Sequence, residues 1–328
     1  EFGLRRAQGH SAGLWGARAA MIGGFNGTSN VEAGKRFGIP VLGTMAHSWV
    51  MSFDEEIDAF REYVRQYHDN LILLADTYNV LEMGVPHAIQ VFKELKEEGR
   101  LPGKYGIRID SGDIAYLSQE ATRMFTEAGF PDAIISGSND LDEYTIQSLK
   151  AQGCTVTSWG VGTKIITADG TSALGGVFKM AVKEADGKEV PVMKFSNDVE
   201  KMTNPGIKTV YRFYKKDTGK MITDLVCLHD EKAADGGDFT LVTESAKWRR
   251  KELKAGTYTV EELLKPVVEN GRNLPLPALF EIIRYADKQI DTLWPEYTRL
   301  LNPDLMEINL SDKLQTLKSE LIRRELGE

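Results

Sequence analysis

KYGIRIDSGD, residues 104–113, is the stretch of sequence that decides the fold. Ile107 and Ile109 alternate with Arg108 and Asp110, so a strand through them has one apolar face and one polar face. The apolar face is expected to pack in a core, which leaves the arginine and the aspartate facing a ligand or solvent. A solvated ion pair of this kind is common and stabilises little, so these residues alone leave both interpretations open.

A turn and a helix follow this strand. Ser111, Gly112 and Asp113 have the turn and N-cap chemistry that ends a strand and begins a helix. The next apolar residues recur at the spacing of one helix face, and they are Ile114, Leu117, Ala121, Met124, Phe125 and Ala128. The segment therefore predicts a strand, a turn and a helix, which is the repeating unit of parallel α/β proteins.

Similar units recur from residue 1 to about residue 165, where short apolar runs alternate with amphipathic stretches. The expected strands are Phe2–Arg6, Met21–Phe25, Pro40–Met45, Leu71–Asp76, Gly106–Asp110, Ala133–Gly137, Thr155–Gly160 and a further one at Ala173–Met180. This number suits a (β/α) barrel better than an open sheet. In a barrel the carboxyl ends of the strands meet at one mouth, so polar residues at those ends are expected to share a cavity.

The periodicity changes after residue 173. Two antiparallel hairpins are expected around Gly187 and Gly219, and helices are expected from about residue 258, where Thr259 and Glu262 form a possible capping box. The sequence thus predicts three parts. They are residues 1–180, an α/β part forming a (β/α) barrel with the active site; residues 181–257, an appended antiparallel β element that completes the barrel and carries a substrate loop; and residues 258–328, a C-terminal helical region.

Composition excludes several classes of protein. Hydrophobic residues make up 42% of the 328 residues, yet no apolar run approaches membrane-spanning length, which predicts a soluble protein. The net charge of -8 and a pI near 5.4 argue against binding of nucleic acid, because such binding needs a cationic surface. A local pocket that binds a phosphate group is not excluded. The chain opens at Glu1 with neither an initiator methionine nor a secretory signal, as expected for a sequence that starts within a fold.

Cysteine and histidine usage narrows the chemistry further. The 2 cysteines, Cys154 and Cys227, exclude a disulfide framework and a thiolate zinc cluster. They favour a reducing compartment, and we expect a cytoplasmic protein. The 5 histidines show no metal-ligand spacing near a carboxylate cluster, so no dedicated transition-metal site is expected.

PVLGTMAHSWV, residues 40–50, places His47 and then Ser48 just after an expected strand. An imidazole there can act as a general base, as a phosphate ligand or as a nucleophile that accepts a phosphoryl group. A lone histidine is more often a hydrogen-bonded structural residue, so the sequence by itself favours that role.

Glycine-rich turns follow two neighbouring expected strands. SWGVGTK, residues 158–164, presents Gly160, Gly162 and Thr163, whose backbone N–H groups and hydroxyl can hold a phosphate. ISGSND, residues 135–140, repeats the arrangement with Gly137 and Ser138. Adjacent phosphate-binding loops are a common site design in barrels, but the demands of the turns alone also explain these glycines.

Further candidates are weaker. In a strand, Arg5 and Arg6 would lie on opposite faces, so only one guanidinium could reach the mouth and hold a carboxylate or phosphate. The segment at residues 198–208 carries Lys201, which could reach a polyphosphate but is also explained as solvated charge. Asp76 and Thr77 lie at another strand end, where a helix cap is a sufficient explanation.

Taken together, several of these segments resemble the nicotinate phosphoribosyltransferases, of the type II phosphoribosyltransferase family. They are EFGLRRAQG (1–9), GGFNGTSNV (23–31), GTMAHSWV (43–50), LLADTYN (73–79), IRIDSGD (107–113), SGSND (136–140), WGVGTK (159–164), LGGVFK (174–179) and KFSNDVEKMTNPGIK (194–208). Their order and spacing match as well as their letters. The likeness is strong to about residue 215 and looser in the tail, and the N-terminal part of the family pattern does not occur in this sequence.

The resemblance implies an irregular (β/α) barrel and an ATP-coupled enzyme of NAD salvage. Nicotinate and phosphoribosyl pyrophosphate would give nicotinate mononucleotide and pyrophosphate, with ATP hydrolysed through a phosphohistidine and Mg²⁺ bound through substrate phosphates rather than by the protein. It further implies a homodimer in which an aromatic residue of a neighbouring subunit, from the N-terminal part, covers the pyridine ring. Activity is therefore expected to depend on that part.

Carried onto this sequence, the resemblance makes His47 the phosphohistidine. Arg108 and Asp110 would complete the catalytic set, with Arg108 over the ring and ribose and Asp110 near the ribose or metal. Arg5 would hold the nicotinate carboxylate. The remaining expected substrate-binding residues, which include the ribose 5-phosphate loops, are Ser48, Asp113, Gly137, Ser138, Gly160, Gly162, Thr163 and Lys201.

Two alternatives remain open at this point. Arg5 reports only that an anion is held, so a nicotinamide or quinolinate phosphoribosyltransferase on the same barrel is a second hypothesis. A noncatalytic phosphoribosyl-binding barrel is a third, because part of the family pattern does not occur in the sequence. Substrate competition separates the first from the second, and binding without turnover would favour the third.

Overall fold

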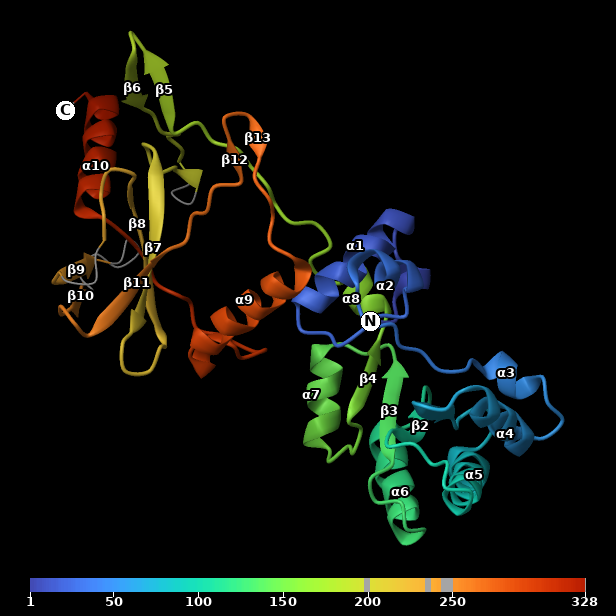
Figure 1. Cartoon of the computed structure of the whole chain (residues 1–328). Helices are drawn as coiled ribbons and strands as arrows, with labels where there is room; N and C mark the ends of the chain where they lie inside the picture. Colours follow the sequence, from blue (N-terminus) through green and yellow to red (C-terminus); the bar gives the residue numbers. More distant parts are fainter. Residues whose placement is uncertain (198–200, 234–236, 243–249, 328) are drawn as a thin grey trace. The chain divides into compact units, whose positions relative to one another are not determined.

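The strand predicted from KYGIRI is β2, Tyr105–Ile109, and it lies inside a four-stranded parallel sheet of order β1-β2-β3-β4 (Figure 1). Its neighbours are β1, Leu71–Leu74, and β3, Ile134–Asn139, and β4, Ser158–Val161, follows at the edge. These four strands were predicted within a few residues. Because all four run in the same direction, their carboxyl ends lie along one edge of the sheet.

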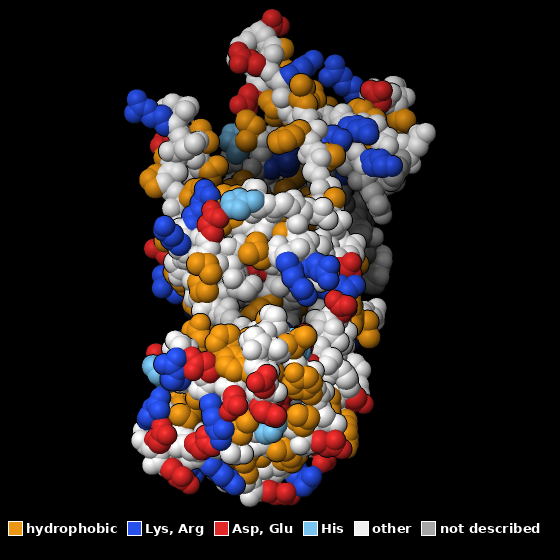
Figure 2. Space-filling model, turned by 90° about the vertical axis from the view of Figure 1, so that its right-hand side faces the viewer, with side chains coloured by type: hydrophobic (Ala, Val, Ile, Leu, Met, Phe, Trp, Pro, Cys, Tyr) orange, Lys and Arg blue, Asp and Glu red, His pale blue; other side chains and the backbone are white. Residues whose placement is uncertain are grey.

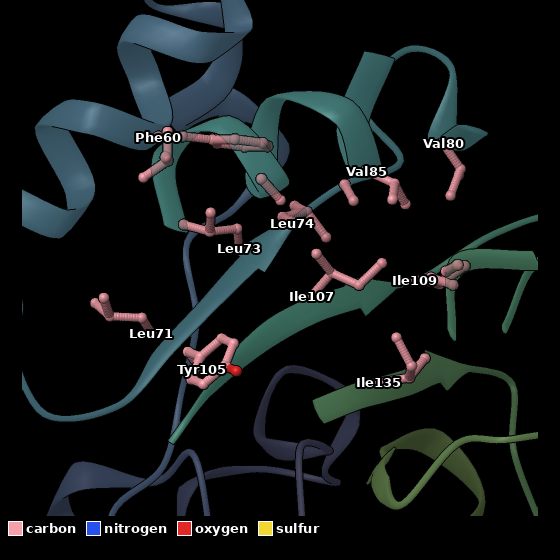
Figure 3. Packing of buried hydrophobic residues seen from close by; sticks show 14 of the residues in the cluster. Phe60, Leu71, Leu73, Leu74, Val80, Val85, Tyr105, Ile107, Ile109 and Ile135 are labelled. Atoms are coloured by element: carbon pink, nitrogen blue, oxygen red, sulfur yellow. The ribbon is translucent and has the colours of Figure 1, made fainter. Parts of the chain in front are cut away.

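Helices connect the strands and cover one face of the sheet. They are the π-helical turn η2 (Val80–Gly84) with α5 (Val85–Glu97), α6 (Ile114–Glu127) and α7 (Glu143–Ala151). The short α8 (Thr163–Ile166) follows β4. Figure 3 shows Leu73, Ile107 and Ile135 on the side of the sheet that faces Phe60 and Val85. These side chains are buried, so the apolar face inferred from the strand alternation is the core face.

Three expected strands near the start of the chain are wrong. Phe2–Arg6 contains the 3-10 turn η1, Leu4–Arg6, and most of Met21–Phe25 is the end of α1, His10–Ile22, and the turn after it. Pro40–Met45 contributes only Val41, in an isolated bridge to Thr28. Short apolar runs fit a buried helix end as well as a strand, and periodicity cannot separate the two. The remaining elements before the sheet are α2 (Val31–Phe37), α3 (His47–Met51) and α4 (Glu56–Gln66).

The structure describes residues 1–197, 201–233, 237–242 and 250–327. Within them the chain divides into two units, unit 1 (Glu1–Leu174) and unit 2 (Gly175–Glu328), with separate hydrophobic cores. The expected strand Ala173–Met180 crosses this division and has no regular structure. The coarse prediction of a mixed α/β fold is confirmed, whereas the described residues form an open parallel sheet and no closed barrel.

Unit 2 is built around a second sheet of order β11-β7-β8-β14. Both predicted hairpins are present, because β5 (Val182–Ala185) pairs with β6 (Lys188–Pro191) and β7 (Lys208–Lys215) pairs with β8 (Met221–Leu228). The other elements are β9 (Phe239–Val242), β10 (Arg250–Leu253), β11 (Tyr258–Glu262), β12 (Val268–Glu269), β13 (Arg272–Asn273), α9 (Leu279–Thr292), the turn η4 (Pro295–Tyr297), β14 (Ile308–Leu310) and α10 (Asp312–Leu326).

The capping box expected at Thr259 and Glu262 is wrong, because both residues lie in β11. Thr259 pairs with Tyr214 of β7, and Glu262 accepts a hydrogen bond from the Thr209 hydroxyl. A spacing of three positions between Thr and Glu fits a helix start, but pairing with an existing hairpin decides the conformation here. Helices do return further along, as α9 and α10.

The surface carries charges of both signs. Acidic and basic side chains are interspersed over the lower part of the face in Figure 2, without a large region of one sign. Among the described residues, no helix combines the length and the apolar character that crossing a membrane requires.

Candidate active site

The strand ends of unit 1 surround a cavity of about 1430 Å³. Of the predicted site residues, the lining includes Arg5, His47, Arg108, Asp110, Ser138, Gly160, Gly162 and Thr163. These residues come from η1, from α3, and from the ends of β2, β3 and β4 and the turns after them. These eight residues share one cavity as expected, although Arg5 and His47 come from a turn and a helix rather than from strand ends.

Arg108 is the centre of a hydrogen-bond network at this edge. It points from β2 to the cavity side, where its Nε donates to Ser138 Oγ at 2.8 Å and its Nη1 donates to Thr44 Oγ1 at 2.7 Å. Its Nη2 donates to Asp110 Oδ1 at 2.9 Å. Three partners fix the plane of the guanidinium, so the group is held ready to meet an anion rather than free in solvent.

Asp110 remains an anion in this network. Burial by itself raises the pKa of its carboxyl, but hydrogen bonds from Ser138 and Arg108, and the charge of Arg108, outweigh burial and leave the pKa below its ordinary value. Its backbone N–H donates to Asp76 Oδ2 at 3.0 Å. The arrangement places a fixed negative charge beside a fixed positive charge in the cavity lining.

His47 begins α3, and its ring lies beside two carboxylates. Nδ1 is 3.1 Å from Thr77 Oγ1, while Nε2 is 4.0 Å from Asp76 Oδ1 and 3.9 Å from Asp110 Oδ2. The side chain is 41% exposed, so the ring has a supported side and a side open to the cavity. An imidazole held by a hydroxyl and flanked by carboxylates is arranged to accept or transfer a proton or a phosphoryl group.

Sequence reasoning missed the roles of Asp76, Thr77 and Thr44. Asp76 is buried, accepts hydrogen bonds from the Asp110 backbone and the Ser111 hydroxyl, and lies beside His47. It is no helix cap, because Asn79 caps η2. The signal in the sequence was the acidic residue at the end of each of two adjacent strands, which share an edge of the sheet.

Arg5 and Arg6 both line the cavity, so the prediction that only one of them can reach it is wrong. The reason is that they lie in a 3-10 turn, whose successive side chains do not alternate as in a strand. Gly3 permits this placement, since a Cβ there would lie 2.5 Å from Ile166 Cβ and 2.6 Å from the Gly162 carbonyl oxygen. The arginines are therefore carried next to the glycine-rich turn after β4.

That turn begins where Phe2 N–H donates to Val161 O at 2.7 Å. A Cβ on Gly160 would lie 3.3 Å from Ser138 Cβ, and one on Gly162 would lie 3.2 Å from Phe2 O. The two predicted phosphate loops thus lie against each other. Close packing explains both glycines without a ligand, yet it also leaves backbone groups and the side chains of Ser138 and Thr163 facing the same cavity.

Four predicted residues do not line the cavity. Ser48 is exposed on α3, and Asp113 is the N-cap of α6, where it accepts from Tyr116 N–H at 3.0 Å. Gly137 lies on the core face of β3, with Val156 Cγ1 3.1 Å from an added Cβ, because strand neighbours alternate and Ser138 takes the cavity side. Lys201 belongs to unit 2, and residues 198–200 of the predicted substrate loop lie outside the described residues.

Comparison with known proteins assigns the chain that forms this cavity to a family. The model of the nicotinate phosphoribosyltransferase (NAPRTase) family matches residues 1–232, and that of the nicotinate phosphoribosyltransferase C-terminal domain matches residues 207–318. The chain belongs to the nicotinate phosphoribosyltransferase family. The segments that resembled this family in the sequence include those that form the cavity.

Individual relatives agree with this assignment. The chain is 41% identical to nicotinate phosphoribosyltransferase of Bacillus subtilis over 98% of its own length and 65% of that protein's length. It is 30% identical to the human enzyme of the same name, with 98% of this chain and 68% of that protein covered. It thus spans about two thirds of the length of these nicotinate phosphoribosyltransferases.

Solved structures support the fold. Human nicotinic acid phosphoribosyltransferase superposes with a TM-score of 0.76 at 28% identity, covering 98% of this chain and 69% of that one. Nicotinate-nucleotide pyrophosphorylase from Pyrococcus furiosus gives a TM-score of 0.62 at 22% identity over 89% of this chain and 64% of that one, which concerns the fold alone.

Proposed function

We propose that the protein containing this chain is a nicotinate phosphoribosyltransferase. It joins nicotinate to phosphoribosyl pyrophosphate, forms nicotinate mononucleotide and pyrophosphate, and hydrolyses ATP through a phosphohistidine at His47. The observation that carries the proposal is one cavity lined by His47, Arg108, Asp110 and the glycine turn at Gly160 and Gly162, in a chain of this family.

The geometry suits glycosyl transfer from a diphosphate. The reacting sugar gains oxocarbenium character as pyrophosphate leaves, so the site must neutralise the departing charge and hold the nitrogen nucleophile in place. Arg108, fixed by Ser138 and Thr44, supplies a rigid cation. Arg5 is proposed to hold the nicotinate carboxylate, and the Gly160–Thr163 turn with Ser138 is proposed to hold the ribose 5-phosphate. Lys201, a residue of unit 2, is proposed as a further substrate-binding residue.

His47 is proposed to take the phosphoryl group of ATP. The attacking ring nitrogen must be unprotonated, and its neighbours must hold the ring in line with the phosphorus, since phosphoryl transfer depends mainly on position and charge. Thr77 at Nδ1 and the carboxylates of Asp76 and Asp110 near Nε2 provide such support. A charged phosphohistidine then appears and disappears next to the proposed pyrophosphate position, which couples ATP hydrolysis to nucleotide formation.

Mg²⁺ is proposed to bind through the substrate phosphates. Among the described residues no group of three or more His, Cys, Asp or Glu side chains is placed to hold a metal ion. Mg²⁺ characteristically keeps several waters and binds to substrate phosphates. When bound it supplies charge neutralisation for the diphosphate, and the residues of the cavity position the phosphates themselves.

The proposal is tested by phosphorylation of His47. The protein is incubated with ATP and the acid-labile phosphate is located by mass spectrometry, in the wild type and in His47→Gln. His68→Gln is the matched control, because His68 lines the same cavity. Label on the wild type and on the control, with none on His47→Gln, is expected. Equal label on His47→Gln, or full nucleotide synthesis by that variant, would overturn the role.

Substrate competition separates the related activities. Turnover stimulated by ATP with nicotinate, and no turnover of nicotinamide or quinolinate, is the expected result. Tight binding of phosphoribosyl pyrophosphate without turnover, in the protein of full family length, would instead favour a noncatalytic binding protein.

The barrel architecture, the oligomeric state and the cellular location are also proposals. We infer that the sheet β1–β4 is one side of an irregular (β/α) barrel, because a second cavity of about 830 Å³ lies on its inner face, lined by Ile72, Ser136 and Ser158 among others. A homodimer is proposed from the family, and a cytoplasmic location from Cys154 and Cys227, which form no disulfide. Chromatography with light scattering on the protein of full family length tests the dimer.

A further inference from the structure

Glu56 is a buried acid that the proposed reaction does not use. It is the first residue of α4 and is 2% exposed. Its Oε2 lies 2.8 Å from Nδ1 of His87, in the first turn of α5. Its Oε1 is buried and has no hydrogen-bond partner among the described residues. A buried carboxyl oxygen without a donor is costly, so either a proton or a donor is expected at this oxygen.

Asp76 shows the same feature on the side of His47. Its Oδ2 accepts two hydrogen bonds, from Asp110 N–H and the Ser111 hydroxyl. Its Oδ1 is buried, has no hydrogen-bond partner in the described part of the chain, and lies 4.0 Å from His47 Nε2. Two buried carboxyl groups of unit 1 therefore each have one oxygen that needs a donor.

The two acids also interact electrically. Burial raises the pKa of Glu56 and the negative charge of Asp76 raises it further, while the hydrogen bond and the charge of His87 act in the opposite direction. His87 of α5 is thus bonded to Glu56, and Asp76 after β1 acts on it through its charge. Two ionised carboxyl groups without a donor between them would repel each other, so one of them is expected to hold a proton.

The packing of the backbone in unit 1 connects the elements that carry Glu56, His87 and Asp76. Helices α3, α4 and α5 pack against one another in unit 1 (Figure 1). At the end of η2, a Cβ on Gly84 would lie 2.0 Å from the Ala75 carbonyl oxygen, so the start of α5 rests directly on the residue before Asp76. π-helical turns are rare and occur often at functional sites. The result is a series in which His47 lies beside Asp76, Asp76 interacts with Glu56, and Glu56 is bonded to His87.

We propose that Glu56 is a positioning residue that carries a proton, accepts a hydrogen bond from His87 Nδ1, and donates one towards Asp76 Oδ1, directly or through one buried water. A neutral Glu56 supplies the donor that Asp76 lacks and leaves Asp76 as the single anion of the pair next to His47. The orientation of Asp76, and through it that of His47, then depends on Glu56. This inference rests on the proposed role of His47.

The decisive comparison is between Glu56→Gln and Glu56→Met. A glutamine reproduces the neutral acid, because its oxygen accepts from His87 and its NH₂ donates towards Asp76, whereas a methionine of similar length does neither. The rate of single-turnover His47 phosphorylation by ATP is expected to stay within about twofold of wild type in Glu56→Gln and to fall about tenfold in Glu56→Met. Glu55→Gln is the matched control, since Glu55 is adjacent and exposed.

A measurement without ATP separates this inference from the proposed function. The NMR signals of the His47 ring, assigned with His47→Gln, are expected to coincide in wild type and Glu56→Gln and to shift in Glu56→Met, where Asp76 loses the donor that fixes its orientation. The NMR result stands even where no protein becomes phosphorylated, which would refute only the role of His47.

Infrared spectroscopy covers the case in which Glu56→Met does not fold. The difference spectrum of wild type minus Glu56→Gln at neutral pH is expected to contain a protonated-carboxyl band that shifts in D₂O. Absence of this band, or a Glu56→Gln variant as slow as Glu56→Met, would overturn the proposal. A folded Glu56→Met with wild-type rate and unchanged His47 ring signals would overturn it as well.

Discussion

At the residue scale, Arg108 is the planar cation that joins three polar side chains of the cavity. Arg108→Lys keeps the charge, but a single ammonium cannot meet Ser138, Thr44 and Asp110 together. The KM for phosphoribosyl pyrophosphate is therefore expected to rise about tenfold or more, measured by steady-state kinetics at saturating nicotinate.

The control for this prediction is Arg100→Lys. Arg100 is exposed and pairs with Glu98 at 2.7 Å, so the same substitution there tests only the change of chemical group. Equal KM values for the two variants would show that the three contacts of Arg108 do not matter for substrate.

Asp110 gives a prediction for pH dependence. Its pKa is lower in the folded protein than its ordinary value, despite burial, because Ser138 and Arg108 hold the anion. Its ionised form therefore stabilises the fold above the ordinary pKa, and this contribution is lost as the pH falls through the lowered pKa. Denaturant unfolding between about pH 5 and pH 2 is expected to show a steeper loss of stability in wild type than in Asp110→Asn.

The exposed Asp54 serves as the comparison for Asp110. Asp54→Asn is expected to keep the wild-type dependence of stability on pH. A wild-type curve parallel to that of Asp110→Asn would mean that Asp110 is not held as an anion.

Sequence reasoning located the residues that strand alternation controls and missed those that come from distant loops. Arg108 and Asp110 were found because alternation puts them on the polar side of a predicted strand, and Ser138 was found because it lies in a glycine-rich turn after the next one. The contact of Arg108 with Thr44 spans 64 positions of the chain, and no local pattern contains it. The burial of Glu56 could not be predicted either. Glu56 precedes an apolar helix face, and it becomes a buried acid only because α4 packs on α5.

At the scale of elements, the junction of η2 and α5 depends on a glycine. An alanine at position 84 would bring a methyl carbon to 2.0 Å from the Ala75 carbonyl oxygen, and a backbone atom cannot move aside cheaply. Gly84→Ala is expected to destabilise the protein by about 1–3 kcal/mol and to slow His47 phosphorylation, because Ala75 precedes Asp76. Urea unfolding and the ATP labelling assay measure the two effects.

Gly103→Ala is the matched substitution, since nothing lies within 4 Å of an added Cβ there. It is expected to change the free energy of unfolding by less than about 0.5 kcal/mol. A Gly84→Ala protein as stable and as active as Gly103→Ala would contradict the proposed tight junction.

Elements were predictable where the local pattern and the tertiary environment agree. The β1–β4 strands and the helices between them carry Ile, Leu and Val at the right period and are buried as expected. Residues 21–25 and 258–262 were misassigned because a few residues satisfy both helix and strand patterns. There the outcome was set by the continuation of α1 and by pairing with β7, which are not local properties.

At the scale of the whole molecule, the two units have separate cores and are expected to unfold in separate steps. The core of unit 1 surrounds Ile107 and Phe92, and that of unit 2 surrounds Phe213 and Tyr258. In unit 2, Arg212 Nε and Nη2 donate to the two oxygens of Asp224 at 2.8 Å each, in a largely buried pair. A protein with two such units does not meet the two-state condition, so calorimetry is expected to resolve two transitions.

Two perturbations should act on different transitions. Asp224→Asn leaves a buried guanidinium without its anion, which costs about 3 kcal/mol, and is expected to lower only the transition of unit 2 by roughly 6–12 °C. Phosphoribosyl pyrophosphate is expected to raise mainly the transition of unit 1, because a ligand stabilises the unit that binds it and the cavity is lined by residues of that unit. Asp217→Asn, in the exposed turn between β7 and β8, should move neither transition. A single transition that responds equally to the substitution and to the ligand would show that the two units unfold as one cooperative structure.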